Sequence, residues 1–267
     1  MMFRASVVAV SLCAATATFA GCPDHELGRV DIYPTADVLP ENVLRLYIYY
    51  PRAMGASAGL AQVRLLDAKG SPLDGVFLPM RQDLWSPDRR RLTLLFDPGR
   101  VKTGLNANEL LGRALMVGQS YTFEVSGTAM DVNGCPLGIR TTYDFTAGPA
   151  DLDPPDPGGW TLVTPAAGSV APLRVSLGSA HDHLSLAFRL RVVDAKDEIV
   201  PGQISLGEVE ESWHFTPRQP WNGSQYALVI EDSLEDLAGN RPGAPFDRPL
   251  GQEILPWQSR VPFSPER

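Results

Sequence analysis

The stretch VRLLDAKGSPLDGVF, residues 63–77, recurs in the second half of the chain as LRVVDAKDEIVPGQIS, residues 190–205. Each copy reads as a strand, an Asp-Ala-Lys turn, a short loop and a second strand. A second pair follows in the same order, YTFEVSGTAMDVNGCPL at 121–137 and YALVIEDSLEDLAGNRPG at 226–243. Matched features in the same order in both halves predict two copies of one domain.

Apolar residues alternate with other residues in the strand-like runs of both halves, which indicates strands with one buried face. The side chains expected on buried faces are Leu44, Leu46, Ile48 and Tyr50; Leu92, Leu94 and Phe96; Tyr121, Phe123 and Val125; Leu186, Phe188, Leu190 and Val192; and Tyr226, Leu228 and Ile230. Gly and Pro, at 24 residues each, favour many turns over long helices. The pattern predicts an all-β chain of two tandem antiparallel β-sandwiches, with a helical candidate at 107–117.

The two copies are joined by AGPADLDPPDPGGW, residues 147–160. Its prolines and glycines exclude a helix or a central strand, so we predict a linker. We expect the first β-sandwich at 29–147, a Pro/Asp linker at 148–157 and the second β-sandwich at 158–263. The first copy is longer, mainly through the stretch at 99–119.

The N-terminus predicts export. One cation, Arg4, precedes a short uncharged run of small and apolar residues, so residues 1–21 are typical of a signal peptide. Residues 19–22 resemble a bacterial lipobox, which makes Cys22 the expected lipid attachment site and the membrane a partner through an acyl anchor. Ordinary cleavage after Ala20 is the alternative, and it permits a Cys22–Cys135 disulfide. We therefore expect a membrane-anchored lipoprotein on the periplasmic face or cell surface, or else a secreted protein.

Each half resembles the bacterial Ig-like domain of the S-layer and adhesin type. The resemblance rests on LRLYIYYPRAM at 44–54, on LWSPDRRRLTLLFDP at 84–98 and on the closing EDLAGN at 235–240. It covers nearly all of the chain after the signal peptide. The resemblance implies Ig-like β-sandwiches that serve as non-catalytic surface, adhesion or spacer modules.

Four aspartates are candidate calcium ligands because calcium takes six to eight oxygens. They are Asp151, Asp153, Asp156 and Asp236. The first three suit a solvated linker better. We predict that Asp236 accepts backbone N–H bonds in a turn where Gly239 has a positive φ. We accordingly expect neither a metal nor a cofactor.

Other polar groups are interpreted as surface features. HDH at 181–183 has ligand chemistry, but two histidines do not close a metal site, so a polar loop is expected. Glu208, Glu210 and Glu211 are expected to be solvated. Arg89 to Arg91, beside Trp85, are expected in a hairpin with the cations in water. No nucleophile elbow or phosphate loop is present, so we expect no catalytic residues and no enzyme activity.

The net charge of −8 makes nucleic acid an unsuitable partner. The function we expect is that of a non-catalytic envelope lipoprotein whose two domains form a binding or spacer module. The alternative is a secreted or periplasmic accessory subunit that binds carbohydrate or a partner enzyme. No sequence motif identifies the protein or glycan partner.

Overall fold

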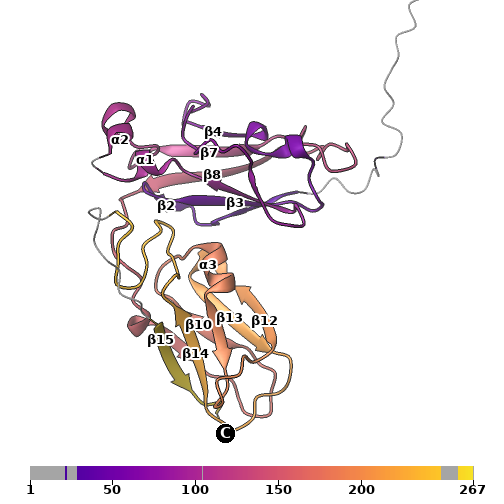
Figure 1. Cartoon of the computed structure of the whole chain (residues 1–267), viewed down its shortest axis with the longest axis vertical. Helices are drawn as coiled ribbons and strands as arrows, with labels where there is room; N and C mark the ends of the chain where they lie inside the picture. The colour runs from indigo at the N-terminus through magenta and orange to yellow at the C-terminus, as the bar shows by residue number, and fades with distance from the viewer. Residues whose placement is uncertain (1–21, 23–28, 104, 248–257, 267) are drawn as a thin grey trace, which may run out of the picture.

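The computed structural model describes residues 22, 29–103, 105–247 and 258–266. The predicted signal peptide at 1–21 lies outside the described residues, as does all of the lipobox except Cys22. The described chain is mostly β, and its four sheets are consistent with β-sandwich domains (Figure 1). None of the helices in the described residues is both long and apolar enough to span a membrane.

Two sheets form the first half of the structure, which we call the first domain. One has the order β1 (Asp31–Tyr33), β3 (Arg45–Tyr49), β6 (Arg91–Leu95) and β5 (Leu84–Trp85). The other has the order β2 (Val38–Pro40), β8 (Thr141–Gly148), β7 (Ser120–Val125) and β4 (Val63–Leu66). Two short helices, α1 (Pro98–Val101) and α2 (Asn106–Leu111), occupy the stretch that lengthens this copy.

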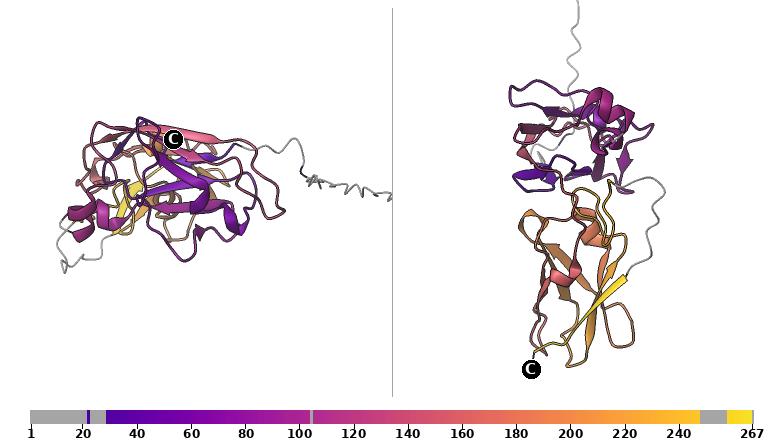
Figure 2. Two further views of the ribbon diagram at one scale, coloured as in Figure 1. Left: turned by 90° about the horizontal axis from the view of Figure 1, so that it is seen from above. Right: turned by 90° about the vertical axis from the view of Figure 1, so that its left-hand side faces the viewer.

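Two further sheets form the second domain. One has the order β12 (Gly202–Leu206), β13 (Ser212–Pro217), β10 (Leu173–Ser176) and β9 (Thr161–Val163). The other has the order β11 (Leu190–Val193), β14 (Tyr226–Glu231) and β15 (Gln258–Phe263). Helix α3 (His183–Phe188) precedes β11. The domains lie one above the other along the long axis of the molecule (Figures 1 and 2).

The two domains share a five-residue turn that begins at an aspartate. Asp67 accepts hydrogen bonds from Lys69 N at 2.9 Å and Ser71 N at 2.8 Å. Asp194 accepts the same pair of bonds two and four residues on, at 2.8 and 3.0 Å. The matching DAK stretches therefore adopt the same turn, because one carboxylate oxygen satisfies two backbone donors in each.

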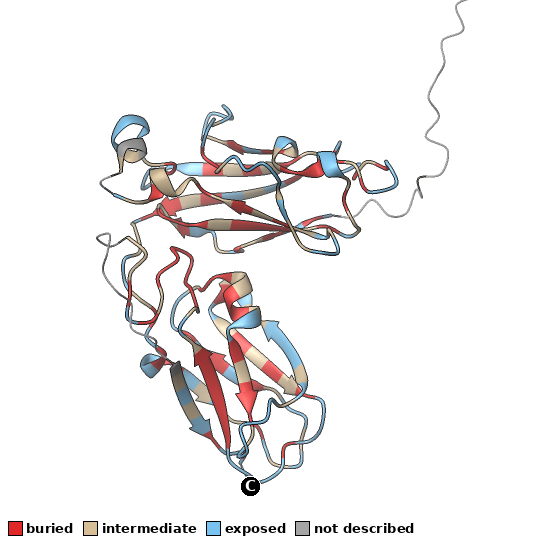
Figure 3. Ribbon diagram, in the orientation of Figure 1, coloured by how far each residue is buried: buried red, intermediate tan, exposed pale blue. Residues whose placement is uncertain are grey.

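Each domain has its own apolar core. One buried cluster draws on residues from 30 to 147 together with Leu237, and a second draws on residues from 160 to 263. Of the expected buried-face residues, those of β3, β6, β7 and β14 are buried, which confirms these predicted strand faces. Figure 3 shows the buried positions along these strands.

Three local predictions are corrected by the structure. The run expected as one strand through Leu186 and Phe188 begins instead as α3, where residues two apart point in different directions. Leu186 is therefore buried, while Phe188 is 65% exposed. The helix expected at 107–117 ends at Leu111, where Gly112 follows with a φ of 72°. Finally, β2 pairs with β8 in parallel, although all-antiparallel sheets were expected.

Candidate functional site at the domain junction

The outer face of β3 carries Arg45, Tyr47 and Tyr49, which alternate with the core residues Leu46 and Ile48. In an isolated sandwich this face would meet water. Tyr47 is nevertheless only 2% exposed. The end of the second domain that carries α3 lies against this face (Figure 1). Both faces of β3 are therefore covered, one by the core of its own domain and the other by the second domain.

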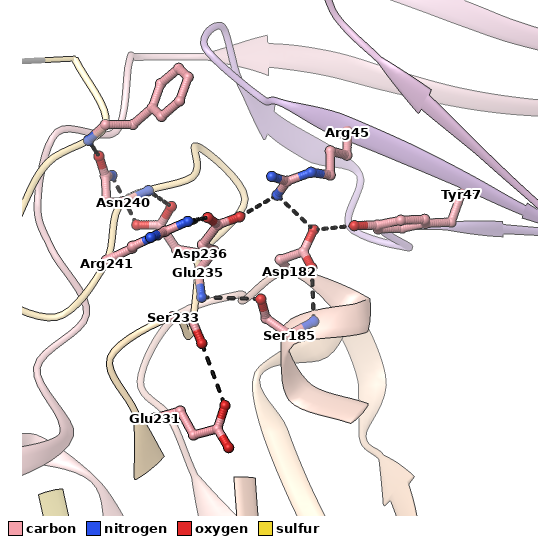
Figure 4. A network of polar contacts seen from close by, with 11 residues as sticks. Arg45, Tyr47, Asp182, Ser185, Glu231, Ser233, Glu235, Asp236, Asn240 and Arg241 are labelled. Carbon is pink, nitrogen blue, oxygen red and sulfur yellow. Dashed lines mark hydrogen bonds and ion pairs between the residues drawn. The ribbon is translucent and has the colours of Figure 1, made fainter. Parts of the chain in front are cut away.

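Asp182 joins the two domains through one carboxylate. One oxygen accepts a hydrogen bond from Ser185 N at 2.8 Å and so caps α3. The other accepts the phenolic hydrogen of Tyr47 at 2.7 Å and lies 3.7 Å from the Arg45 guanidinium (Figure 4). Burial raises the pKa of the Asp182 carboxyl, and Arg45 opposes that rise. The residue that starts α3 is thus also a contact to the first domain.

Glu235 lies between two arginines, one from each domain. One of its oxygens is 2.5 Å from the Arg45 guanidinium, across the junction. The other accepts hydrogen bonds from two nitrogens of Arg241, at 2.9 and 2.6 Å. A carboxylate with both oxygens bonded to guanidinium groups offsets much of the cost of leaving water.

The closing turn, residues 236–240, has the geometry predicted for it. Asp236 accepts hydrogen bonds from Ala238 N and Asn240 N, both at 2.9 Å, and Gly239 has a φ of 81°. The equivalent turn of the first domain matches it, because Asp131 accepts from Asn133 N and Cys135 N, both at 2.8 Å. The predicted roles of Asp236 and Gly239 are confirmed.

The closing turn also serves as a contact surface. Residues 234–240 are all buried, on the side of the second domain that faces the first (Figure 3). Leu44 N donates a hydrogen bond to Leu237 O at 2.9 Å, and Leu237 belongs to the apolar core of the first domain. A main-chain hydrogen bond and a shared core residue therefore connect the domains.

The linker is bound to the same junction through its backbone. Asp151 O accepts hydrogen bonds from the side-chain amides of Asn42 at 2.7 Å and Asn240 at 3.1 Å. Asp151 N in turn donates to the Asn42 side-chain oxygen at 2.8 Å. One amide from each domain thus fixes the start of the linker.

Three of the four calcium candidates, Asp151, Asp156 and Asp236, use their carboxylates in local hydrogen bonds. The Asp151 side chain accepts from Asp153 N at 3.0 Å, and Asp156 caps a short 3-10 turn by accepting from Gly158 N at 2.9 Å. Asp236 uses its carboxylate within the closing turn. In the part of the chain that the structure describes, no three acidic, histidine or cysteine residues form a group that could hold a metal ion.

A second contact, formed by Glu210, was not expected from the sequence. Glu210 is 1% exposed, which corrects the prediction that it is solvated. Its carboxylate accepts Thr35 N of the first domain at 2.9 Å, and its carbonyl accepts His181 N at 3.1 Å. Val209 and Glu210 both have left-handed φ angles, 50° and 57°. A β-branched residue adopts this region only under strain, so packing and the contact to Thr35 hold the turn.

The two histidines of the HDH stretch point to different surroundings. His181, expected in a polar loop, is 1% exposed and lies edge-on to Trp160, with 5.6 Å between the ring centroids. Burial lowers its pKa. The ring of His183 instead packs on Tyr33 of the first domain, with 3.8 Å between centroids. Asp182 and His183 of the stretch predicted as a polar loop therefore contact the first domain, whereas His181 is buried in the second.

A groove opens beside the Tyr33–His183 pair. It has a volume of about 540 Å³ and is bounded by Tyr33 and Thr35 of the first domain and by α3, β12 and the Glu208–Glu210 turn of the second. A smaller cavity of about 320 Å³ in the first domain shares Tyr33 and Thr35 with it. Both volumes are in the range of ligand sites. The junction thus has a buried polar contact and an open groove next to it.

The arginine hairpin is only partly solvated. The Arg89 guanidinium lies 5.0 Å from the centre of the Trp85 ring and donates to Met54 O and Gly55 O. The first interaction is a cation–π contact, and the carbonyl bonds use two of its nitrogens. Arg89 therefore fixes the loop after β3 instead of facing water as predicted.

Cys22 forms a disulfide with Cys135, which is the alternative that the sequence left open. The bond indicates an oxidising, extracytoplasmic compartment. A sulfur that carries a diacylglyceryl group cannot also form a disulfide, so acylation of Cys22 and this bond exclude each other in one molecule. Acylation of Cys22 stays a prediction.

The closing turn gives the protein a testable pH dependence. Burial raises the pKa of Asp236 to about 7, although hydrogen bonds from Asn240 and Ala238 lower it. The same carboxyl titrates at about 3.9 in the unfolded chain. Between pH values of about 3.9 and 7, the folded protein therefore holds a proton on Asp236 that the unfolded chain has lost. This contribution to stability is fully present below the unfolded pKa and is lost as the pH rises through about 7.

As the pH rises from 5.5 to 8.0, loss of the Asp236 proton is therefore expected to lower the free energy of unfolding by about 1–2 kcal/mol. The measurement is denaturant unfolding of the wild type and of Asp236→Asn across this pH range. The difference between their pH slopes isolates the carboxyl, since the other titrating groups are common to both. Equal slopes would contradict the expectation.

Comparisons with known proteins place the chain in no family. No family model matches it, and no curated protein matches it. One similar solved structure is native alpha-2-macroglobulin from Escherichia coli spanning domains MG0-NIE-MG1, with 10% identity, a TM-score of 0.28, and 88% of this chain and 71% of that one covered. Another is the mouse coronavirus receptor-binding domain complexed with its murine receptor, with 10% identity, a TM-score of 0.18, and 76% and 92% covered. TM-scores this low do not establish a common fold.

Proposed function

We propose that the chain is an exported, non-catalytic module of the bacterial cell envelope whose two β domains act as one rigid binding or spacing unit. The observation that carries the proposal is the polar junction. Tyr47, Glu210 and Leu237 of the closing turn are all buried, and each makes a hydrogen bond to the other domain, as a flexible tandem would not. Fixed orientation is what a spacer or a two-domain binding surface needs.

Assignment to the bacterial Ig-like family remains part of this proposal. It is supported by the motifs of both copies, by their shared aspartate turns and by the matching sheet order. The corresponding strands are β1-β3-β6-β5 in the first domain and β9-β10-β13-β12 in the second. Fold alone does not define a role, so the binding function is argued from the junction.

Small-angle X-ray scattering tests the rigidity that the proposal requires. We expect the scattering curve of the mature protein to fit a single two-domain arrangement, the same at low and high salt. A curve that requires an ensemble of interdomain angles would overturn the rigid module. Salt is the informative variable because buried ion pairs are screened much less than exposed ones.

Two proposals stand for the N-terminus. In the first, an acylated Cys22 anchors the module to a membrane. In the second, Cys22 is bonded to Cys135, and the protein is periplasmic or secreted as an accessory subunit that binds carbohydrate or a partner enzyme. The Cys22–Cys135 bond supports the second.

Reduction of the disulfide is expected to destabilise the protein. The disulfide closes a loop with a sequence separation of 113 residues, so reduction is expected to lower the free energy of unfolding by about 2–4 kcal/mol. Thermal unfolding with and without reductant, with Cys22→Ser as a variant that reductant should not affect, measures this. Mass spectrometry of the purified mature protein checks the bond itself. Peptides of Cys22 and Cys135 linked only without reductant support it, and a diacylglyceryl mass on Cys22 supports the anchor.

A further inference from the structure

We propose that the junction groove, together with the free edge of β12, binds an extended peptide segment that adds a strand to β12 and places a basic side chain, preferably arginine, beside Glu208. This inference deepens the proposed binding function and rests on it. The inference is based on an unpaired strand edge that borders a groove lined by acidic and aromatic residues.

The first observation is that β12 is an edge strand. Within the described residues, β13 is the one strand that pairs with it. Pro201 O accepts from Arg218 N at 2.8 Å and Gly207 N donates to Ser212 O at 2.9 Å, so the odd-numbered residues of the strand exchange hydrogen bonds with β13. In an antiparallel ladder the alternate residues point their main-chain groups away. The N–H and C=O groups of Ile204 therefore face the open edge.

The second observation is that this edge is accessible. Gln203, Ile204 and Ser205 are exposed, with Ile204 at 38%. An exposed strand edge is a template for pairing with another extended chain, and many binding domains use such an edge. The five residues of β12 suit a peptide of similar length.

The third observation is the chemistry of the groove into which β12 leads. The groove is lined by Tyr33 and His183 and by four consecutive residues, Ile204, Ser205, Leu206 and Gly207. Among the described residues, the lining includes Glu208 and Glu210 and no lysine or arginine. Glu208 is exposed, whereas Glu210 is buried.

These groups fit a cationic side chain. Glu208 can accept hydrogen bonds from a guanidinium, and the paired rings of Tyr33 and His183 line the same groove, where a planar cation can contact an aromatic side chain. Arginine suits both contacts better than lysine, because its guanidinium is planar and can donate two parallel hydrogen bonds to one carboxylate. An acidic side chain at the same place would meet the exposed Glu208 carboxylate and is excluded by repulsion.

The test uses the full mature protein and a phage-displayed library of random ten-residue peptides. Ile204→Pro removes the outward N–H and adds bulk at the open edge but breaks no hydrogen bond to β13. Its matched control is Ile204→Thr, which keeps the N–H. Glu208→Gln removes the exposed carboxylate, and Glu198→Gln removes another exposed carboxylate of the same domain as its control.

We expect the wild type and both controls to enrich peptides with one arginine at a fixed position among strand-forming residues. The best such peptide should bind Glu208→Gln about tenfold more weakly and Ile204→Pro at least about tenfold more weakly, as loss of a charge-assisted hydrogen bond predicts. If Ile204→Pro does not fold, N-methylation of alternate amides in the selected peptide replaces it and should abolish binding.

Three results would overturn the proposal: no enrichment, enrichment without a basic residue, or binding that survives both Ile204→Pro and N-methylation. If the wild type shows a single rigid arrangement in scattering but captures no peptide, the peptide site is rejected and the proposed two-domain module stands. Interdomain flexibility in scattering removes the module itself.

Discussion

Replacing Gly239 with alanine is expected to destabilise the protein by about 2–4 kcal/mol and to weaken the contact between its domains. Gly239 has a φ of 81°, where an L-residue costs about 1–2 kcal/mol. A Cβ built at this position would lie 2.6 Å from Cδ2 of Leu44, a buried side chain of the first domain. The alanine must therefore strain its own turn and push against the neighbouring domain.

The first domain supplies a matched control in Gly134→Ala. Gly134 occupies the equivalent position of the equivalent turn, with a φ of 80°, but a Cβ added there would meet no atom within 4 Å. This control should cost only the backbone strain, about 1–2 kcal/mol. The difference between the two free energies of unfolding, measured by denaturant titration, reports the domain contact. Equal losses would show that the closing turn does not dock on the first domain.

Replacing Arg45 with methionine is the second large expected effect, a loss of about 2–3 kcal/mol. The change leaves one Glu235 oxygen and the Asp182 carboxylate without their cation, while their side chains remain 10% and 6% exposed. Removing one partner of a buried ion pair leaves the other charge uncompensated, which is why the loss is large. Because the Arg45 side chain itself is 23% exposed, we expect a smaller loss of stability than for a fully buried ion pair.

Arg140→Met is the control for Arg45→Met. Arg140 pairs with Glu124 at 2.9 Å, but its side chain is 68% exposed, so a change below about 0.5 kcal/mol is expected. A double-mutant cycle of Arg45→Met with Glu235→Gln then isolates the pair. A coupling free energy near zero would contradict the role of this ion pair at the junction. Calorimetry on the same variants shows whether their domains still unfold together.

The strands were predictable because alternation depends on one local requirement, burial of one face. Leu46 and Ile48 show this for β3. The two DAK turns were predictable for a different local reason, because one aspartate satisfies two backbone donors in each. Helix α3 was missed because its six residues also alternate as a strand would. The signal that identifies it is Asp182, a helix N-cap residue.

The junction could not be predicted in the same way, because its partners are far apart in the sequence. Tyr47 and Asp182 are separated by 135 residues, and Thr35 and Glu210 by 175. Nothing local to Glu210 shows that the other domain covers it. One signal was present: the outer face of β3 carries two tyrosines and an arginine, residue types that are enriched at interfaces. Alternation alone places that face in solvent.

The central claim is that the polar junction makes two β domains one unit, and scanning calorimetry of the mature protein tests it most directly. We predict one endotherm with equal calorimetric and van't Hoff enthalpies, and loss of this single transition in Gly239→Ala but not in Gly134→Ala. Two separate endotherms in the wild type, unchanged in both variants, would contradict the claim.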